Sequence, residues 1–349
     1  MKALVFYEHG ELDKLHIADV PQPQPGPGEV LVQVKASALN HLDIWVRRGW
    51  PGLKLSLPHV LGADGAGIVA ALGEGVTGVE VGARCAIDPG VNRYADEYTR
   101  RGLDSVSPGY YIIGEHAPGF HAEYAVVPAV NLLPIPAEAN SAPYGDLASA
   151  AAASLVFLTA WRMLSHQARV RAGESVLILG AGGGANSAAV QVAKFAGCTV
   201  YATTSSPEKA QKVRELGADV VLDYRDDPEW PKSIYKLTGK RGVDVVVDNV
   251  GQATWGDSLR AVARGGRVVS VGNTSGPIAS TDIRFIFGKQ ISIVGSTMGS
   301  HQDYRDVMAR VFDGTFRPVI DRVMPLDQGV EAMAILERGE QCGKIVLEA

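Results

Sequence analysis

The 349-residue chain has little cysteine, no run of basic residues and no hydrophobic segment of bilayer length. Its cysteines, Cys85, Cys198 and Cys342, are far apart and lack Cys-x-x-Cys spacing, which excludes a disulfide framework or a thiolate metal knuckle built from neighbouring residues. The basic residues form isolated pairs in a chain of formal net charge −5, so nucleic acid is not expected as a partner. Together these features indicate a globular protein of a reducing, cytoplasmic compartment.

No segment of the sequence predicts insertion into a membrane. The N-terminal run "ALVFYE" is interrupted by charge and glycine too soon to be a signal peptide. The longest apolar stretch, "LASAAAASLVFLTAW" at residues 147–161, is shorter than the roughly 20 residues that a bilayer span needs. We interpret it as a buried, alanine-rich helix and expect no membrane partner.

Two different patterns follow one another along the chain. Up to about residue 130, short β-like runs such as "EVLVQVKA" and "GAGIVAAL" alternate with glycine and proline, which predicts a β-rich, barrel-like unit. The proline-rich segment 131–143 is interpreted as a linker. From residue 175, six apolar β runs alternate with helix-length segments at 185–196, 207–216, 227–238 and 252–263, the pattern of a doubly wound parallel sheet. After about residue 300, two helices and a last strand can return to the first domain.

The segment "SVLILGAGGGANSAAVQVAKFAG" joins an apolar strand to a helix through a glycine-rich turn. At the head of six β/α units this predicts a dinucleotide-binding loop, because glycines let the backbone approach a pyrophosphate, whose charge the helix N-terminus meets. Two registers of the G-x-G-x-x-G/A motif are open. One runs from Gly180 to Ala185, and the other from Ala181 to Asn186, where asparagine takes the last glycine's place because it tolerates left-handed backbone.

The end of the second β run bears on the choice of nicotinamide cofactor. An NAD site has an acid about 20 residues beyond the glycines, whereas an NADP site offers cations and hydroxyls to the 2′-phosphate. Here "TTSSPEK" offers Thr204, Ser205, Ser206 and Lys209, which Tyr224 and Arg225 after the third β run can join. The sequence therefore favours NADPH. In the simpler alternative the serines only cap a helix and the lysine is solvated, and the two interpretations are compatible.

A combination of segments is spread over nearly the whole chain and includes "PHVLGADGAGIVAALGEGV", "GFHAEYAVVP", the glycine loop, "ELGADVVLDY", "VDVVVDNVG" and "GKIVL". In this combination the chain resembles the medium-chain dehydrogenase/reductase superfamily. The resemblance implies an α/β protein with a GroES-like β-rich catalytic domain, formed by residues 1–130 and 300–349, and a Rossmann domain, residues 131–299. It also implies an active site in the cleft between the domains.

Relative to the zinc alcohol dehydrogenases that the chain resembles, the zinc ligands are missing. Those enzymes carry Cys at the position of Asn40, a His-Glu pair at Ala63 and Asp64, and Cys or Asp at Leu155. Catalytic zinc needs about three thiolate, imidazole or carboxylate ligands, so we predict that it is absent. The four cysteines of the structural-zinc lobe are likewise replaced, by Arg93, Asp96, Thr99 and Ser107. The alternative, a metal site rebuilt from histidines, would use His41, His59, His116 or His121.

Without zinc, the alkoxide–carbonyl chemistry of a simple alcohol lacks its main electrostatic support. A quinone or an α,β-unsaturated carbonyl spreads incoming charge over an enolate or quinol oxygen, for which hydrogen bonds suffice. The resemblance to zinc-free quinone oxidoreductases and enone reductases, through Asn40 and Asp43 in "NHLD", points the same way. We therefore predict NADPH-dependent reduction of a small conjugated acceptor, with the final proton from water. The alternatives are alcohol or aldehyde dehydrogenase activity and a non-catalytic NADPH-binding protein.

The resemblance also assigns residues to roles. The candidate catalytic residues are Asn40, His41, Asp43 and Asp64. The candidate cofactor-binding residues lie in the glycine loop, at strand ends and in the last strand: Thr159, Gly182, Gly183, Gly184, Ala185, Asn186, Thr204, Ser205, Ser206, Lys209, Tyr224, Asn249, Val250, Gly272, Asn273, Gly295, Ser296 and Lys344. For Thr159, Gly272 and Gly295 the alternative is a purely local structural role.

Asp64, in "VLGADGAG", is the carboxylate that remains in the zinc-ligand pattern. Alone it cannot hold a metal, and we interpret it as an arginine-paired or otherwise supporting carboxylate near the cleft, with catalytic acid as the alternative.

The strand "KQISIVGSTM" ends the sheet, so its edge must be paired or covered. Because relatives pair this strand with its twin, we predict a homodimer or a dimer-based tetramer.

Overall fold

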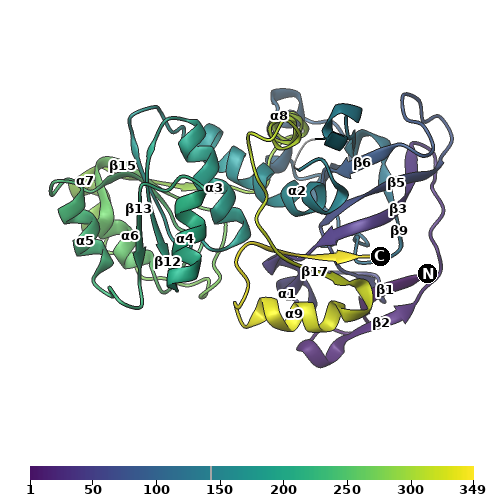
Figure 1. Cartoon of the computed structure of the whole chain (residues 1–349), viewed down its shortest axis with the longest axis horizontal. Helices are drawn as coiled ribbons and strands as arrows, with labels where there is room; N and C mark the ends of the chain where they lie inside the picture. Colours follow the sequence, from purple (N-terminus) through teal and green to yellow (C-terminus); the bar gives the residue numbers. More distant parts are fainter. Residues whose placement is uncertain (142–143) are drawn as a thin grey trace. The chain divides into compact units, whose positions relative to one another are not determined.

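The computed structural model describes residues 1–141 and 144–349, which form two compact units (Figure 1). Unit 1 comprises Met1–Leu158 and Gly299–Ala349, and unit 2 comprises Thr159–Met298. Unit 1 thus includes residues 131–158, which the sequence pattern places in the second domain. The reason is partly that β10 (Leu132–Pro134) pairs with β6 (Arg84–Ile87) of the first domain's sheet. Two residues of the predicted linker, 142 and 143, lie outside the described residues.

Unit 1 is built around a seven-stranded sheet of order β10-β6-β5-β3-β18-β17, with β9 also paired to β3. Its remaining members are β3 (Glu29–Ala38), β5 (Asp64–Leu72), β9 (Tyr124–Pro128), β17 (Ile320–Pro325) and β18 (Lys344–Glu348). The predicted return of the C-terminal strand is confirmed, because β18 runs antiparallel to β3. Two smaller sheets join β1 (Lys2–Phe6) with β2 (Leu15–Asp19) and β4 (His59–Val60), and β7 (Gly90–Asn92) with β8 (Tyr110–Ile112).

Close backbone contacts explain the glycines around Asp64. Gly62 has φ +105°, and a Cβ there would lie 2.7 Å from the ring of His121. A Cβ at Gly67 would lie 2.1 Å from the carbonyl oxygen of Gln33 on β3, so no larger residue fits without separating the strands. The glycines therefore allow β5 to pack tightly against its neighbours.

Four helices belong wholly or mostly to unit 1: α1 (His41–Arg48), α2 (Leu147–Trp161), α8 (His301–Phe312) and α9 (Gly329–Glu337). A π-helical turn, Arg162–Gln167, extends α2 to a continuous helix of 21 residues. This helix is long and apolar enough to cross a membrane, so the sequence-based estimate of its length was too short. Because 78% of its apolar window is buried within the protein, it fits the predicted core helix.

Unit 2 contains the predicted parallel six-stranded sheet, and the structure gives its strand order as β13-β12-β11-β14-β15-β16. Its strands are β11 (Ser175–Ile178), β12 (Thr199–Thr204), β13 (Val220–Asp223), β14 (Val243–Val247), β15 (Val262–Ser270) and β16 (Ser292–Gly295). Figure 1 shows helices on both of its faces. They are α3 (Gly184–Phe195), α4 (Pro207–Glu215), α5 (Trp230–Leu237), α6 (Trp255–Ala261) and α7 (Ile283–Lys289).

Two helices of unit 2 differ from the sequence expectation. The helix predicted at 252–263 is shortened to α6, because Asp248 accepts the amides of Val250 and Gly251 and holds a turn before the helix. Helix α7 lies outside the four helix-length segments that the sequence pattern predicts, and Asp282 caps it by accepting the amide of Arg284. The strand order, which places the dinucleotide loop, is unaffected.

Candidate functional site

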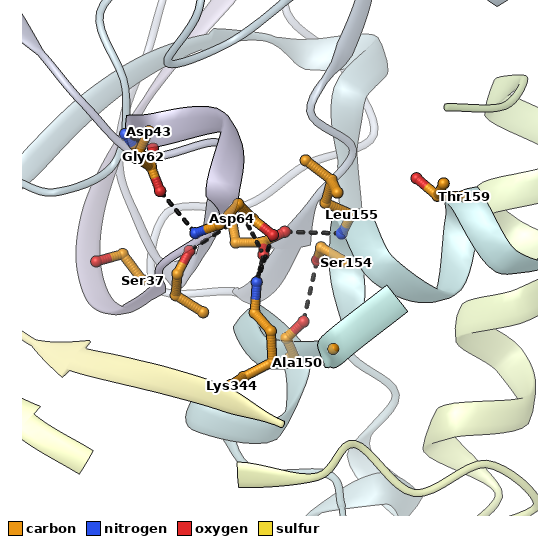
Figure 2. A network of polar contacts seen from close by, with 12 residues as sticks. Ser37, Asp43, Gly62, Asp64, Ala150, Ser154, Leu155, Thr159 and Lys344 are labelled. Carbon is orange, nitrogen blue, oxygen red and sulfur yellow. Dashed lines mark hydrogen bonds and ion pairs between the residues drawn. The ribbon is translucent and has the colours of Figure 1, made fainter. Parts of the chain in front are cut away.

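Asp64 lies at the centre of a buried polar cluster in unit 1 (Figure 2). Its Oδ2 accepts hydrogen bonds from Lys344 Nζ at 2.8 Å and from Asn40 Nδ2 at 2.9 Å. Its Oδ1 accepts the backbone amide of Leu155 at 2.7 Å. Lys344 Nζ also donates to Asn40 Oδ1 at 2.6 Å. Asp64 is thus a lysine-paired carboxylate, and the arginine suggested from sequence is not its partner.

The sheet topology of unit 1 brings these residues together. Strand β3 lies between β5 and β18, and Ala38 pairs with Asp64 on one side and with Val346 on the other. Asn40 follows the end of β3 and Lys344 begins β18, so their side chains meet beside Asp64. All three are buried, since the exposed fractions are 0% for Asp64, 4% for Lys344 and 8% for Asn40. A buried charge needs a partner, and this arrangement supplies one.

Asp43 holds the backbone around Asn40 in place through hydrogen bonds. One carboxylate oxygen accepts the Asn40 amide at 2.7 Å at the start of α1, and the other accepts the Gly62 amide at 3.0 Å. His121 lies nearby, with Nε2 3.6 Å from Asp43 and Nδ1 2.9 Å from the Ser37 hydroxyl. Asp43 therefore joins the end of β3, helix α1 and the start of β5, as a residue that orients others.

His41, the first residue of α1, is half-buried next to this cluster. Burial lowers the pKa of its imidazole, and the positive charge of Lys344 lowers it further. The uncharged ring is thereby favoured near neutral pH. The neighbourhood of the cluster already contains one cation, which disfavours a second.

This set of donors does not fit a catalytic zinc ion. Both amide protons of Asn40 are used, because Nδ2 also donates to the Ala38 carbonyl at 3.3 Å, and its oxygen accepts from Lys344. Ala63 has no ligand atom, and Leu155 contributes only an amide donor. Over residues 1–141 and 144–349, no three His, Cys, Asp or Glu side chains are grouped to hold a metal. An ammonium bound to Asp64 would moreover repel a divalent cation.

The lobe at residues 93–116 has a second network where the family's four cysteines would lie. Asp96 Oδ1 accepts the amides of Tyr98 and Thr99, both at 2.9 Å, and Oδ2 accepts the Ser107 hydroxyl at 2.7 Å. The bond from the Thr99 amide is the main reason that the pKa of the Asp96 carboxyl is lowered, followed by the bond from Ser107. Arg93 takes no part and lies over the Tyr111 ring, 4.9 Å from its centroid. Three of the four positions therefore form one hydrogen-bonded turn.

The glycine loop of unit 2 forms an open cradle. Gly180 has φ +64°, and a Cβ at Gly183 would meet no atom closer than 3.7 Å. Gly183 is the N-cap of α3 and offers no side-chain cap, so the first amides of the helix are left for a ligand. The loop thus fits the pyrophosphate of a dinucleotide. Its positive-φ residue supports the register that begins at Gly180.

Asn186, on the first turn of α3, fastens this loop to the sheet. Its Nδ2 donates to the Leu179 carbonyl at 2.7 Å, and its Oδ1 accepts from Asn249 at 2.6 Å. Asn249 in turn accepts the amide of Val271 at 2.8 Å. The two asparagines therefore link three strand ends, which explains why a polar residue occupies this helix position. Val250 lies beside the loop, 3.6 Å from a Cβ built on Gly180.

The residues predicted to select the cofactor have mixed environments. Ser206 caps α4 by accepting the Lys209 amide at 3.3 Å, so the capping interpretation holds for this serine. The Lys209 side chain lies across the glycine loop, 3.0 Å from a Cβ built on Gly182. The Thr204 hydroxyl is buried and donates to the Ser206 carbonyl, whereas Tyr224 is 41% exposed. Lys209 thus places a cation next to the loop.

The remaining predicted cofactor residues lie at strand ends of unit 2 or beside them. Ser296 follows β16, and its buried hydroxyl has no hydrogen-bond partner among the described residues. A Cβ at Gly295 would meet nothing within 4 Å, whereas at Gly272 it would lie 3.3 Å from the Asn249 carbonyl oxygen. Thr159 makes one long contact with the Met298 sulfur at 3.8 Å. An unpaired hydroxyl and an open glycine suit a ligand at this edge.

Two contacts of the cluster were not predicted from the sequence. Lys344 was assigned to the cofactor, and its pairing with Asp64 had no local signal because the two are 280 positions apart. The hydrogen bond from the Leu155 amide to Asp64 also had no signal in the sequence. A third feature, the bond between His301 Nδ1 and Asp88 at 2.7 Å, joins α8 to the residue that follows β6.

The fold and the two sites define a two-domain protein with a GroES-like unit and a dinucleotide-binding unit. Residues 26–137 match the family described as alcohol dehydrogenase GroES-like domain, and residues 185–313 match the family described as zinc-binding dehydrogenase. The chain belongs to the medium-chain dehydrogenase/reductase superfamily, whose members are nicotinamide-dependent oxidoreductases.

Full-length relatives carry different activities. A zinc-type alcohol dehydrogenase-like protein of Schizosaccharomyces pombe is 32% identical, covering 99% of both chains. The quinone oxidoreductase of Rattus norvegicus is 30% identical over 99% of this chain and 97% of its own. Among solved structures, an NAD-dependent alcohol dehydrogenase has 42% identity and a TM-score of 0.93, covering 100% of both chains. A 2-octenoyl-CoA carboxylase reductase in complex with NADP and 2-octenoyl-CoA has 29% identity and a TM-score of 0.88, covering 100% of this chain and 87% of its own.

Proposed function

We propose that this protein reduces a conjugated acceptor, a quinone or an α,β-unsaturated carbonyl compound, with NADPH and without zinc. The observation that carries the proposal is the Lys344–Asp64–Asn40 cluster, in which Asn40 and Asp64 stand at positions of the family's zinc-ligand pattern and Lys344 binds both. The only carboxylate of that set is paired with an ammonium, and the other side chains offer no thiolate or imidazole. Zinc-dependent oxidation of a simple alcohol has no support from such a site.

The likeness to a quinone oxidoreductase and to a reductase bound to 2-octenoyl-CoA supports this acceptor class. In both kinds of compound the charge that arrives with a hydride is delocalised onto an oxygen. Fixed hydrogen-bond donors in a buried environment can stabilise that oxygen without a metal. The acceptor class therefore matches what the cluster can do.

The choice of NADPH rests on the surroundings of the glycine loop. Lys209 extends across the loop, and the hydroxyl residues Thr204, Ser205 and Ser206 replace the acid of an NAD site. The acid nearest to these hydroxyl residues along the chain is Glu208, in the first turn of α4. A hydrogen bond from Ser206 lowers the pKa of its carboxyl. We therefore propose that a cation and hydroxyls face the 2′-phosphate.

The residues of this chain would have the following roles in binding NADPH. The amides at the start of α3 and the open backbone of Gly182–Gly184 hold the pyrophosphate, while Asn186 and Asn249 keep the loop in place. The Ser296 hydroxyl is available to the nicotinamide half. Bound NADPH would supply the hydride, so the protein contributes binding and orientation.

A spectrophotometric assay tests the proposal. NADPH oxidation is measured with a panel of quinones, enones and enoyl thioesters, before and after incubation with a strong zinc chelator. We expect turnover of at least one conjugated acceptor that the chelator leaves unchanged, and a higher kcat/KM with NADPH than with NADH. Tight NADPH binding without turnover of any acceptor would instead indicate a non-catalytic protein.

Alcohol dehydrogenase activity is the second candidate, because the structure with 42% identity is an NAD-dependent alcohol dehydrogenase. The same assay, run in reverse with NAD and NADP and a panel of alcohols, distinguishes the two. Chelator-sensitive alcohol oxidation would contradict the zinc-free proposal.

We also propose that two copies associate through β16. This strand is at the end of the sheet, and exposed apolar side chains gather on it and near α7: Ile278, Ile283, Phe287 and Ile293. Pairing of two β16 strands would cover both the open edge and these side chains. Light scattering of the protein and of Ile293→Lys tests this, since the variant is expected to shift towards the monomer.

A further inference from the structure

Lys344 carries a hydrogen-bonding capacity that the cluster does not use. An ammonium group has three N–H donors, and two of them are engaged by Asp64 Oδ2 and Asn40 Oδ1. The two N–H donors of Asn40 are both engaged, by Asp64 and by the Ala38 carbonyl. Asn40 is a candidate catalytic residue by family resemblance, yet its side-chain amide has no donor left to offer. Within this cluster, Lys344 is the residue with a donor to spare.

We propose that Lys344 takes over the electrostatic role of the zinc ion, and that its third N–H stabilises the oxyanion of the reduced acceptor. This inference rests on the proposed function. A hydride supplied by NADPH, which would leave as NADP, forms the new C–H bond at the β-carbon of the acceptor. The C=C π pair becomes the double bond between the α-carbon and the carbonyl carbon, and the C=O π pair moves to the oxygen, so that an enolate forms. Lys344 donates a hydrogen bond to the enolate oxygen and keeps its proton. Water then protonates the α-carbon, so one hydride and one proton are consumed.

The surroundings of Lys344 favour this role. Asp64 accepts three hydrogen bonds and so holds the ammonium in a fixed place, which means that little reorganisation is needed when charge develops. The exposed fraction of Lys344 is 4%, and in such an environment a charge acts more strongly than in water. The charge is felt nearby, since Lys344 contributes to the lowered pKa of His41.

The other assignment for Lys344, a contact with the cofactor, makes a different prediction. A cofactor contact acts on NADPH affinity, whereas a donor to the oxyanion acts on the chemical step. The two are separated by comparing kcat, the KM for the acceptor and the Kd for NADPH in the same variants.

The main experiment compares Lys344→Met, which keeps the length of the side chain, and Lys344→Arg, which keeps its charge, with Lys194→Met. Lys194 pairs with Asp219 on the surface of unit 2 and serves as the matched control. We expect Lys344→Met to lower kcat about 100-fold while the Kd for NADPH, measured by fluorescence titration, changes less than about threefold. Lys344→Arg should recover part of kcat, and Lys194→Met should behave as the wild type.

Two results would overturn the proposal. Unchanged kcat in Lys344→Met would show that the ammonium is not needed, and an equal loss in NADPH affinity would make Lys344 a cofactor contact. Loss of the fold is checked with Asp64→Leu/Lys344→Met, which removes the ion pair as a whole. If this double variant is folded and binds NADPH, its kcat should be as low as that of Lys344→Met, and wild-type turnover would contradict the proposal.

A binding measurement separates this inference from the proposed function. The probe is p-nitrophenolate, an oxyanion whose absorbance changes when it is hydrogen-bonded, titrated in the presence of NADP. We expect binding to the wild type and at least about tenfold weaker binding to Lys344→Met, because the interaction with the ammonium is lost. Turnover of conjugated acceptors with equal phenolate binding by both proteins would leave the proposed function standing and overturn the role of Lys344. Failure of the wild type to bind p-nitrophenolate would also overturn the proposed role of Lys344.

Discussion

The catalytic-zinc positions and the structural-zinc lobe have lost their metal ligands in different ways. Around Asp64 the replacement is a buried ion pair, in which Lys344 supplies a full positive charge. In the lobe the replacement is a half-exposed turn, in which backbone amides and the Ser107 hydroxyl satisfy Asp96 without any cation. The difference follows from burial. A carboxylate without exposure needs a counter-charge, whereas one with access to water needs only local hydrogen bonds.

We therefore expect a metal site to be rebuilt more readily in the lobe than at the Asp64 cluster. The side chains of Asp96, Thr99 and Ser107 converge, and the segment keeps the length of the cysteine pattern. At Asp64, by contrast, an ammonium lies next to the carboxylate. The following experiments challenge that contrast.

Introducing the family's four cysteines into the lobe should have the largest effect, which is the gain of a zinc site. We expect Arg93→Cys/Asp96→Cys/Thr99→Cys/Ser107→Cys to bind one equivalent of zinc, seen as a thiolate–cobalt absorption band on substitution and as a rise in Tm, because four thiolates satisfy zinc. The control Arg93→Cys alone should bind none tightly.

Introducing zinc ligands at the Asp64 cluster should give a weaker zinc site than the lobe variant. Asn40→Cys/Ala63→His/Leu155→Cys adds three ligands but leaves the Lys344 ammonium in place, so its zinc affinity, measured by competition with a chelating dye, should be weaker than that of the lobe variant. Equal or tighter zinc binding would show that Lys344 does not exclude a second cation.

The sequence predicted the fold well because its signals are local. Strands, helices and the glycine turn each occupy a few residues, and apolar periodicity fixes their type. The alternation of strands and helices predicted that β11–β16 form one parallel sheet, although it did not give their order in the sheet. Helix α7 was missed since its cap, Asp282, lies in a polar segment that is also typical of a loop.

The site was harder to predict because its partners are distant in sequence. Lys344 meets Asp64 only because β3 pairs with both β5 and β18, a fact of topology that no motif records. The missing zinc ligands could be seen directly, but the identity of the cation beside Asp64 could not. Likewise, the role of Asn186 depends on Asn249, which is 63 positions away.

Breaking the buried pair should cost more stability than breaking the lobe network. We expect Asp64→Leu to lower the free energy of unfolding by about 3–5 kcal/mol, since Lys344 is left buried without its counter-charge. Asp64→Leu/Lys344→Met should lose much less, because a hydrophobic pair can replace an ion pair. Calorimetric unfolding of the single and double variants measures the coupling, and simple additivity would contradict it.

The smallest effect is expected for Asp96→Asn, and it depends on pH. The pKa of the folded carboxyl is lowered, so its contribution is fully present above the unfolded pKa of about 4 and is lost as the pH falls through the folded value. Near neutral pH, the amides of Tyr98 and Thr99 should therefore exchange hydrogen a few-fold faster in Asp96→Asn than in the wild type, measured by mass spectrometry of the lobe peptide. The ratio of the two rates should approach one as the pH falls, because the wild-type carboxyl is then neutral as well. The neighbouring exposed Glu97→Gln is the control and should leave the ratio at one at every pH. A ratio that stays constant with pH would mean that the shape of the turn, rather than the charge of Asp96, has replaced the metal in the lobe.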